Sequence, residues 1–473
     1  MVHSVVSAEQ ADGHRRRWSD DDWGRLNVSV NDGRTAGQNQ KRSTMSCCFR
    51  RLVLVGCLIV LPVSAWAQGA MLHGIGPINS AMGGAGVALP IESLGALTFN
   101  PALIASAEGN QISFTTEFFK DGIIIDTTLE GGLKGRTTGT SHLTVIPAFG
   151  WMLRDPKGKL ALGFGLIGLA GFGADYPTDN ASVLFAAAPG GFGRIYTDYR
   201  ETKIPVAFAY QVTPKLAIGA SLNVYMGSFA VAPLPYKFYD LDAAGNRYYP
   251  EAGKLDNSWA IAGQFGFNYQ ATPKMSIGGS ITTPQNFAPY KWNSTYASPA
   301  GANYGQARTL EFDLDGPMIV SVGFGLKPSA KTKIAVDGMF SKYKGVHGFG
   351  GPGGINNGVV DPFGWRSVWT IKAGVQHQVT DTLTVRAGYN FSQMPLRSEV
   401  VLSATGAPAT FQNHFCGGFG IKMFPFLEMV ASFYFVPREH VVGPFPDLKG
   451  KVLGTLDESN KLTGGLIGMN FRF

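Results

Sequence analysis

Residues 376–391 read QHQVTDTLTVRAGYNF, which is a strand, a short polar turn and a second strand. In the second strand apolar residues occupy every other position, namely Leu383, Val385, Ala387, Tyr389 and Phe391. The positions between them hold Thr384, Arg386, Gly388, Asn390 and Ser392. The strand before the turn alternates in the same way, with Lys372 at one of its polar positions. Because successive side chains of a strand point to opposite faces, this stretch predicts an antiparallel hairpin with one apolar and one polar face.

The same unit recurs along the chain. Three further copies are close in pattern and two are looser, at residues 209–224, 268–283, 325–340, 151–166 and 421–436. Short turns join the strands of each hairpin, and longer loops rich in Gly, Asn, Pro and Ser join one hairpin to the next. With an opening strand near 110–119 and a closing strand near 460–473, the chain predicts about fourteen strands. An even number, short turns on one side and long loops on the other are typical of outer-membrane barrels.

Composition favours a membrane location for this all-β fold. The chain of 473 residues has 62 Gly, 12% aromatic residues and only 15% charged residues, against about 25% charged in an ordinary soluble protein. The predicted strands run to about 12 residues, longer than the usual 5 or 6. We therefore expect a transmembrane antiparallel β-barrel whose apolar faces meet lipid and whose polar faces line a lumen. The closing strand ends in Phe473, which resembles the assembly signal of bacterial outer-membrane barrels and implies the barrel-assembly machinery as a partner.

The first 67 residues are expected to be absent from the mature protein. Residues 45–67 have the order of a secretory signal, with Arg50 and Arg51 before an apolar core and Ala65-Trp66-Ala67 at the cleavage site. Residues 1–44 are polar and are interpreted as a mis-annotated upstream extension, an extended signal region being the alternative. The rest carries a formal charge of about +4 without a basic block, so the sequence gives no support for nucleic-acid binding.

A short apolar stretch, LTFNPALIAS at residues 97–106, precedes the first strand. Asn is a favoured helix N-cap and Pro is tolerated in the first turn, so we expect a helix from Pro101 to Ala107 that is capped by Asn100 and closed by Gly109. A helix of about two turns is unstable alone. It therefore needs an enclosing structure.

The N-terminal stretch and a late hairpin together resemble the long-chain fatty-acid outer-membrane transporter family, the FadL type, which includes aromatic-hydrocarbon uptake channels. The first block has the small-residue run Gly83, Gly84, Ala85 and Gly86, and then, after Phe99, the motif Asn100, Pro101, Ala102 and Leu103. The second block is GWRSVWTIKAGVQHQVTDTLTVRAGYNFSQMPL at residues 364–396. The resemblance implies a hatch of short helices at 68–108 that plugs a 14-stranded barrel at 109–473. It also implies passive uptake of hydrophobic small molecules through loop capture, a lumenal pocket and movement of the hatch.

Basic residues on the polar faces are candidates to meet a carboxylate cargo. Lys372 and Arg386 share the inner face of neighbouring strands, and Lys203 is a third candidate. Lys333 and the anions Glu117, Asp313, Asp337 and Glu428 are also expected to face inward. The alternative is a network of ion pairs that braces the barrel and the hatch.

The apolar pocket is expected in the long loops and the hatch. Its candidate residues are Phe172, Phe185, Phe192 and Phe229, together with the hatch residues Leu97, Phe99, Leu103 and Ile104. The alternative is that the loop aromatics pack on one another or anchor in lipopolysaccharide.

The sequence favours a transporter over an enzyme. His414 and Cys416 share one strand face and could form a nucleophile pair, but the sequence shows no third residue at a spacing that would orient them. The histidines form no metal-ligand pattern, so neither a metal nor a cofactor is expected. Long-chain fatty acids are the preferred cargo, with aromatic hydrocarbons as the alternative. A structural or adhesive barrel in which the hatch never moves is a further alternative.

Overall fold

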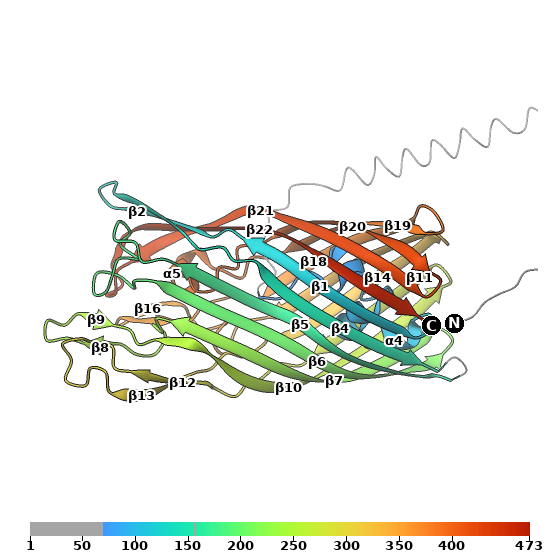
Figure 1. Ribbon diagram of the computed structural model, residues 1–473, viewed down its shortest axis with the longest axis horizontal. Helices are drawn as coiled ribbons and strands as arrows, with labels where there is room; N and C mark the ends of the chain where they lie inside the picture. Colours follow the sequence, from blue (N-terminus) through green and yellow to red (C-terminus); the bar gives the residue numbers. More distant parts are fainter. Residues whose placement is uncertain (1–69, 156–157) are drawn as a thin grey trace, which may run out of the picture. The chain divides into compact units, whose positions relative to one another are not determined.

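Fourteen strands close into one antiparallel barrel in the computed structural model, which describes residues 70–155 and 158–473 (Figure 1). The two N-terminal segments, 1–44 and 45–67, therefore lie outside the described residues. The barrel strands, in chain order, are β1 (Gln111–Asp121), β4 (Thr144–Arg154), β5 (Leu160–Tyr176), β6 (Ile195–Thr213), β7 (Leu216–Ala232), β10 (Ala252–Thr272), β11 (Met275–Thr282), β14 (Met318–Ser329), β15 (Thr332–Lys342), β18 (Val368–Gln378), β19 (Leu383–Ser392), β20 (Asn413–Phe424), β21 (Leu427–Pro446) and β22 (Val452–Arg472).

Each barrel strand pairs with the next, and β22 pairs with β1 to close the barrel. The closing register runs from Gln111 opposite Arg472 to Asp121 opposite Leu462. All six predicted hairpins are present, and the predicted strand number is confirmed. Closure leaves no unpaired edge along the wall, which is what a sheet in lipid requires.

The remaining short strands lie mainly in the loops at one end of the barrel, opposite the C-terminus in Figure 1. They are β2 (Ile124–Leu129), β3 (Lys134–Thr138), β8 (Asp240–Leu241), β9 (Arg247–Tyr248), β12 (Tyr290–Thr295), β13 (Ala307–Phe312), β16 (Gly354–Asn356) and β17 (Val359–Asp361). The hairpin of β2 and β3 extends the sheet along β22. Long loops are extracellular and short turns periplasmic in such barrels, which orients the molecule.

The two faces of the wall differ as the alternation predicts. On β18 the side chain of Trp369 is 58% exposed and that of Ile371 57%, whereas Thr370 is 1% and Lys372 2% exposed. The same division holds on β19, where Val385 is exposed and Arg386 is buried. Apolar side chains thus cover the outside of the barrel and polar ones the lumen. None of the described helices is long and apolar enough to cross a membrane.

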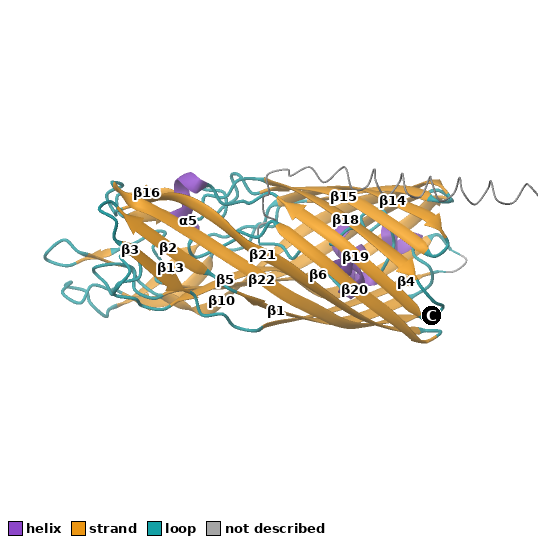
Figure 2. Ribbon diagram, turned by 90° about the horizontal axis from the view of Figure 1, so that it is seen from above, coloured by secondary structure: helices purple, strands orange, loops and turns teal. Residues whose placement is uncertain are grey.

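The N-terminal segment, defined here as residues 70–110, lies inside the barrel (Figure 2). It contains α2 (Pro77–Ala81), α3 (Ser93–Phe99) and α4 (Leu103–Ser106). The helix α2 contacts β19 to β22, whereas α3 and α4 contact the strands that follow round the barrel, from β1 through β4 to β7. Two more short helices, η1 (Ser398–Val400) and α5 (Val401–Ala404), lie in the loop after β19. The lumen thus supplies the enclosure that short helices need.

Two expectations about helices in the N-terminal segment are wrong. The predicted helix from Pro101 to Ala107 is a single turn, α4, because its amides bond to carbonyls only three residues back, such as Leu103 N to Asn100 O at 3.1 Å. The second error is an omission, since a hatch of short helices was expected but none was predicted at the position of α3. It lacks any side-chain cap and begins at a Ser, and its seven residues are all buried. Packing against the wall stabilises it where local signals do not.

Candidate functional site

An aromatic cluster fills the extracellular half of the lumen. Phe229 at its centre is 0% exposed, and its ring centroid lies 6.2 Å from that of Phe172 and 5.6 Å from that of Tyr290. Phe172 also contacts Tyr199 at 5.1 Å. We define the aromatic cluster as Phe172, Tyr199, Phe229, Tyr290, Trp292, Phe312, Phe349, Phe363 and Trp365. Two of the predicted pocket residues, Phe172 and Phe229, therefore lie together.

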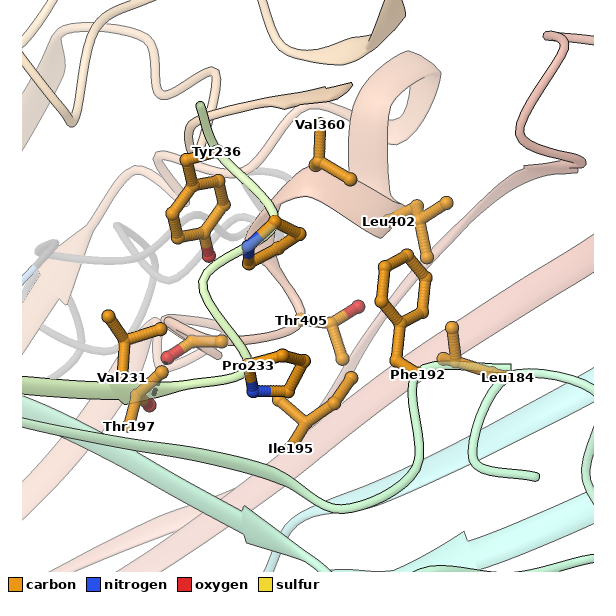
Figure 3. A pocket seen from close by; sticks show the side chains of 12 residues that line it. Leu184, Phe192, Ile195, Thr197, Val231, Pro233, Tyr236, Val360, Leu402 and Thr405 are labelled. Carbon is orange, nitrogen blue, oxygen red and sulfur yellow. Dashed lines mark hydrogen bonds between the residues drawn. The ribbon is translucent and has the colours of Figure 1, made fainter. Parts of the chain in front are cut away.

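The other two predicted loop aromatics lie at the edge of the same apolar core. Phe185 packs on Tyr176 at 4.8 Å, and Phe192 stacks on Tyr249 at 5.1 Å. Phe192 also lines a small cavity of about 30 Å³ between four extracellular loops (Figure 3). Its other lining residues include Leu184, Ile195, Thr197, Val231, Pro233, Tyr236, Val360, Leu402 and Thr405. Since one water needs about 10–15 Å³ by this measure, a hydrophobic ligand enters only if these loops part.

The predicted hatch residues do not join this core. Leu97, Phe99, Leu103 and Ile104 belong to a second apolar cluster, which α3 and α4 form with the wall at Met152, Ile167 and Ala207. A single pocket built from loops and hatch together stays a prediction, because in this structure the named residues belong to two clusters. The polar inner faces of the wall strands separate an extracellular aromatic cluster from a lower cluster around the N-terminal segment.

Lys203 anchors the N-terminal segment to β6. Its ammonium donates hydrogen bonds to the carbonyl oxygens of Leu97 at 3.1 Å and Thr98 at 3.2 Å, and to Gln264 Oε1 at 2.8 Å. Both carbonyls stand in the last turn of α3, where unpaired acceptors and the helix dipole favour a positive charge. The strand β6 thus holds the C-terminal end of this helix.

Lys372 and Asp337 form a second anchor on β18 and β15. The Lys372 ammonium donates to His73 O at 3.3 Å and lies 4.5 Å from the centre of the Phe99 ring. Its partner across the strands, Asp337, accepts the amides of Gly86 at 2.6 Å and Val87 at 2.9 Å. An acidic and a basic side chain of the lumen therefore grip two different parts of the N-terminal segment.

The predicted glycine run lets the N-terminal segment touch the wall. Gly83, Gly84 and Gly86 all have positive φ, at 68°, 79° and 158°. A Cβ on Gly84 would lie 1.8 Å from His73 O, and one on Gly83 would lie 2.7 Å from Tyr389 O on β19. Neither position has room for a side chain. The run is thus a close contact within the segment and between the segment and β19.

Asn100 links three pieces of backbone. Its Oδ1 accepts the amide of Ala102 at 3.1 Å, but this bond lies ahead of α4 and does not cap it, so the predicted cap is wrong. Its Nδ2 donates to Val87 O at 2.8 Å and to Phe267 O of β10 at 2.9 Å. Pro101 and Ala102 then run so close to β7 that a Cβ on Gly219 would lie 2.5 Å from Ala102 N. The Asn-Pro-Ala motif is therefore a docking point on the wall.

Arg386 has different partners from Lys372. The two residues lie on the same face of neighbouring strands, two inward-facing positions apart. Its Nε donates to Gln376 Oε1 at 2.8 Å, and its NH2 group donates to Glu428 Oε1 at 2.8 Å. The two predicted cations thus do not converge on one ligand. Among the predicted anions, Glu117 accepts the Tyr434 hydroxyl at 2.6 Å inside the lumen. Asp313 was misplaced, because it lies exposed in a loop, 3.6 Å from Lys237.

Several residues of the anchors were missed from the sequence. Asn390 donates to the carbonyls of His73 and Gly83, and Gln264 donates to Thr98 O at 3.0 Å. His73 stacks on His414 at 5.1 Å. For Asn390, Gln264 and His414 the only sequence signal is their position on the inner face of a strand. Many other polar residues share that position. No group of His, Cys, Asp and Glu among the described residues could hold a metal ion.

Fold and site together define a class of protein, a 14-stranded transmembrane β-barrel whose lumen is filled by its own N-terminal segment. Residues 258–425 match the family described as outer membrane protein transport protein (OMPP1/FadL/TodX). This match confirms the resemblance to the FadL type. The family that the chain matches over this stretch is one of outer-membrane transport proteins.

Solved structures with this fold cover most of the chain. The toluene transporter TodX of Pseudomonas putida is 19% identical with a TM-score of 0.65, over 85% of this chain and 99% of its own. A FadL homologue of Pseudomonas aeruginosa is 15% identical with a TM-score of 0.65, over 86% and 100%. The toluene transporter TbuX of Ralstonia pickettii is 17% identical with a TM-score of 0.59, over 85% and 99%. No curated protein matches the sequence.

Proposed function

We propose that the protein is a passive channel whose preferred cargo is a neutral aromatic hydrocarbon and whose N-terminal segment is a movable plug. The observation that carries the cargo class is the aromatic cluster around Phe229, which is built from loops and wall strands on the extracellular side. An aromatic ligand gains about 25 cal/mol for each Å² of apolar surface that it buries there. Offset and edge-to-face ring contacts of the kind already present add to this.

The state of the lumenal cations also favours a neutral cargo. Lys203 has three oxygen partners, and Arg386 is paired with Glu428. A carboxylate reaching either residue has to displace these partners. A neutral hydrocarbon does not. Relatives that share the fold include two described as toluene transporters.

Long-chain fatty acids are the second candidate, and Lys372 is the residue that favours them. The hydrogen bond that it donates to His73 O is long at 3.3 Å, and its other close neighbour is the Phe99 ring. A carboxylate is a stronger partner for an ammonium than a carbonyl oxygen or a ring face. A fatty acid that reaches Lys372 would therefore loosen the grip on the N-terminal segment.

Movement of the plug means release of its anchors. Residues 68–108 would shift against a barrel of residues 109–473, with loss of the contacts made by Lys203, Asp337 and Asn100. The bonds to the two charged side chains contribute about 1.5–3 kcal/mol each. A barrier of this kind keeps the lumen closed without cargo. It stays low enough to be crossed during uptake.

Uptake of labelled toluene and oleate into cells that lack other such channels tests the proposal. We expect the native protein to raise toluene uptake above the empty-vector level, with a smaller rise for oleate. Phe229→Ala should reduce toluene uptake more than oleate uptake, because the rings around it lose their central partner. A chain that lacks residues 68–86 provides the comparison for the plug. Equal and negligible flux of both compounds in both proteins would leave a structural or adhesive barrel as the explanation.

A further inference from the structure

A polar cavity of about 330 Å³ lies at the periplasmic end of the lumen, away from the aromatic cluster. The turns after β14, β18 and β20 and the end of β22 surround it. Five basic and three acidic side chains line it, namely Lys331, Lys333, Arg386, Lys422 and Arg472 with Glu108, Asp381 and Glu428. We call it the periplasmic mouth. Its lining carries an excess of positive charge.

Strand register brings these side chains into one belt. Lys333 pairs with Gln376, and Gln376 pairs with Arg386 on the next strand. Further round the wall, Glu428 pairs with Lys422 on one side and Asn470 on the other. Residues that pair across neighbouring strands share a face of the sheet. The register thus gives two runs on the lumenal face, one from β15 to β19 and one from β20 to β22, and the ion pair of Arg386 with Glu428 joins them.

One carboxylate of the belt serves two guanidinium groups. Glu428 Oε1 lies 2.8 Å from Arg386 NH2, and its Oε2 lies 3.5 Å from Arg472 NH2. The Arg386 side chain is 2% exposed, and its NH1 group has no hydrogen-bond partner among the described residues. A buried guanidinium donor without an acceptor is costly. Arg386 is one of the residues that line the cavity, while its NH1 atom is buried beside Gly420.

Gly420 keeps this ion pair in place. A Cβ on Gly420 would lie 2.1 Å from Glu428 Oε1 and 2.7 Å from Arg386 NH1. The glycine therefore leaves room for Arg386 to reach across β20 to Glu428. Three further cations of the mouth, Lys331, Lys333 and Lys422, form no ion pair with a described acidic side chain. Glu108 and Asp381 likewise form none with a described basic side chain.

We propose that the periplasmic mouth is a binding site for small carboxylates. The carboxylate would sit between Lys333 and Lys422, with the charge of Arg386 in the lining beside it. Pro425, Phe426 and Leu427 provide an apolar side for the hydrocarbon part of the ligand. The basic side chains of the site all belong to the wall and its turns, and the N-terminal segment contributes only Glu108 to its charge. The site therefore does not depend on the plug or on the cargo of the aromatic cluster.

Calorimetric titration of the purified full chain, in nonionic detergent at low ionic strength, tests the site. Benzoate is the probe, and benzyl alcohol is its neutral match. We expect benzoate to bind and benzyl alcohol to bind at least about tenfold more weakly, because the charge-assisted contacts are lost. The double variant Lys333→Gln/Lys422→Gln should weaken benzoate binding by about tenfold or more. Lys331→Gln, at an exposed turn, should weaken it in the same direction and serves if the double variant does not fold.

Two lysines at other periplasmic turns give the matched control. Lys215→Gln/Lys274→Gln removes the same charge outside the mouth and should leave benzoate binding unchanged. Octanoate identifies the source of the carboxylate: tighter binding than benzoate indicates a chain-bearing acid that leaves the lumen, and weaker binding indicates a small acid from the periplasm. The proposal is overturned if benzoate binds no better than benzyl alcohol, or if both double variants weaken it equally. Neither result bears on toluene uptake, which is measured separately.

Discussion

Lys203 shows how a single buried charge positions a whole helix. Its ammonium has three oxygen partners, and two of them are carbonyls at the end of α3. The sequence predicted its place in the lumen, because strand parity fixes the face. It did not predict the partner, because a cation on an inner face can meet a cargo carboxylate, a wall anion or a helix end. In this protein the partner of Lys203 is the end of α3.

Replacing Lys203 by Met should loosen the end of α3. The change removes the donor to Leu97 O and to Gln264 Oε1, and a buried acceptor left unsatisfied costs about 1–3 kcal/mol. We expect a lower melting temperature in detergent and more frequent opening in planar-bilayer recordings. Lys215→Met, at an exposed turn, is the control. Identical melting temperature and conductance in both variants would show that Lys203 does not stabilise the end of α3.

Asn100 was identified from its motif, and it accepts the Ala102 amide, although this bond precedes α4 and does not cap it. What the motif does not reveal is the pair of bonds from Nδ2 to Val87 and to Phe267 of the wall. Helix-cap preferences describe local backbone, whereas these partners lie 13 and 167 residues away. A single sequence gives no signal for contacts at that separation.

Asn100→Ala should free residues 97–106 from the wall without harm to the barrel. Loss of the bond to the Ala102 amide costs about 0.5–1.5 kcal/mol, and the two further bonds add to it. Hydrogen exchange of this stretch should become faster, while the heat-modifiable migration of the barrel stays unchanged. Asn303→Ala, in an exposed extracellular loop, should leave exchange there as it is. Unaltered exchange in Asn100→Ala would contradict the docking role.

At the scale of elements, strands were predictable and helices were not. The barrel strands repeat a period of two over many residues, so β18 and β19 were recognised with the correct faces. The helix α3 has neither a cap nor an amphipathic pattern, since it is buried all round. Short loop strands such as β8 and β9 depend on contacts between loops. Periodicity says little about elements of two or three residues.

Substitution in the glycine run tests how closely the N-terminal segment must pack against its surroundings. Gly84→Ala places a Cβ 1.8 Å from His73 O, at a residue with φ of 79°. We expect the segment to lose its place, which should raise ion conductance and sensitivity to large antibiotics. Gly131→Ala is the matched control, because Gly131 has φ of 94° and nothing within 4 Å of its Cβ. It carries only the backbone penalty of about 1 kcal/mol. Equal behaviour of the two variants would mean that the close contact is unimportant.

At the scale of the whole molecule, the closed wall explains why an unstable segment folds. Closure from β1 to β22 creates a lumen with polar walls, and the buried N-terminal segment satisfies many of those polar groups. Barrel, strand number and orientation followed from the sequence because they repeat along it. The division of the interior into an aromatic cluster, an anchored segment and a charged mouth did not. That division depends on which inner-face residues meet across the lumen.

The claim that cargo passes only when the N-terminal segment moves is tested most directly by locking that segment to the wall. Ser93 of α3 and Ser113 of β1 have hydroxyl oxygens 2.8 Å apart, so a Ser93→Cys/Ser113→Cys pair is placed to form a disulfide. Cys416 is replaced by Ala in this background, because it is the one cysteine among the described residues. A wall-to-wall pair, Ser228→Cys/Asn257→Cys, where the native side chains lie 2.6 Å apart, is the control.

Toluene uptake is then compared under oxidising and reducing conditions. We predict that oxidation of the Ser93→Cys/Ser113→Cys protein abolishes uptake, that reduction restores it, and that the control pair transports equally in both states. Full uptake by the oxidised, demonstrably cross-linked protein would contradict the movable plug.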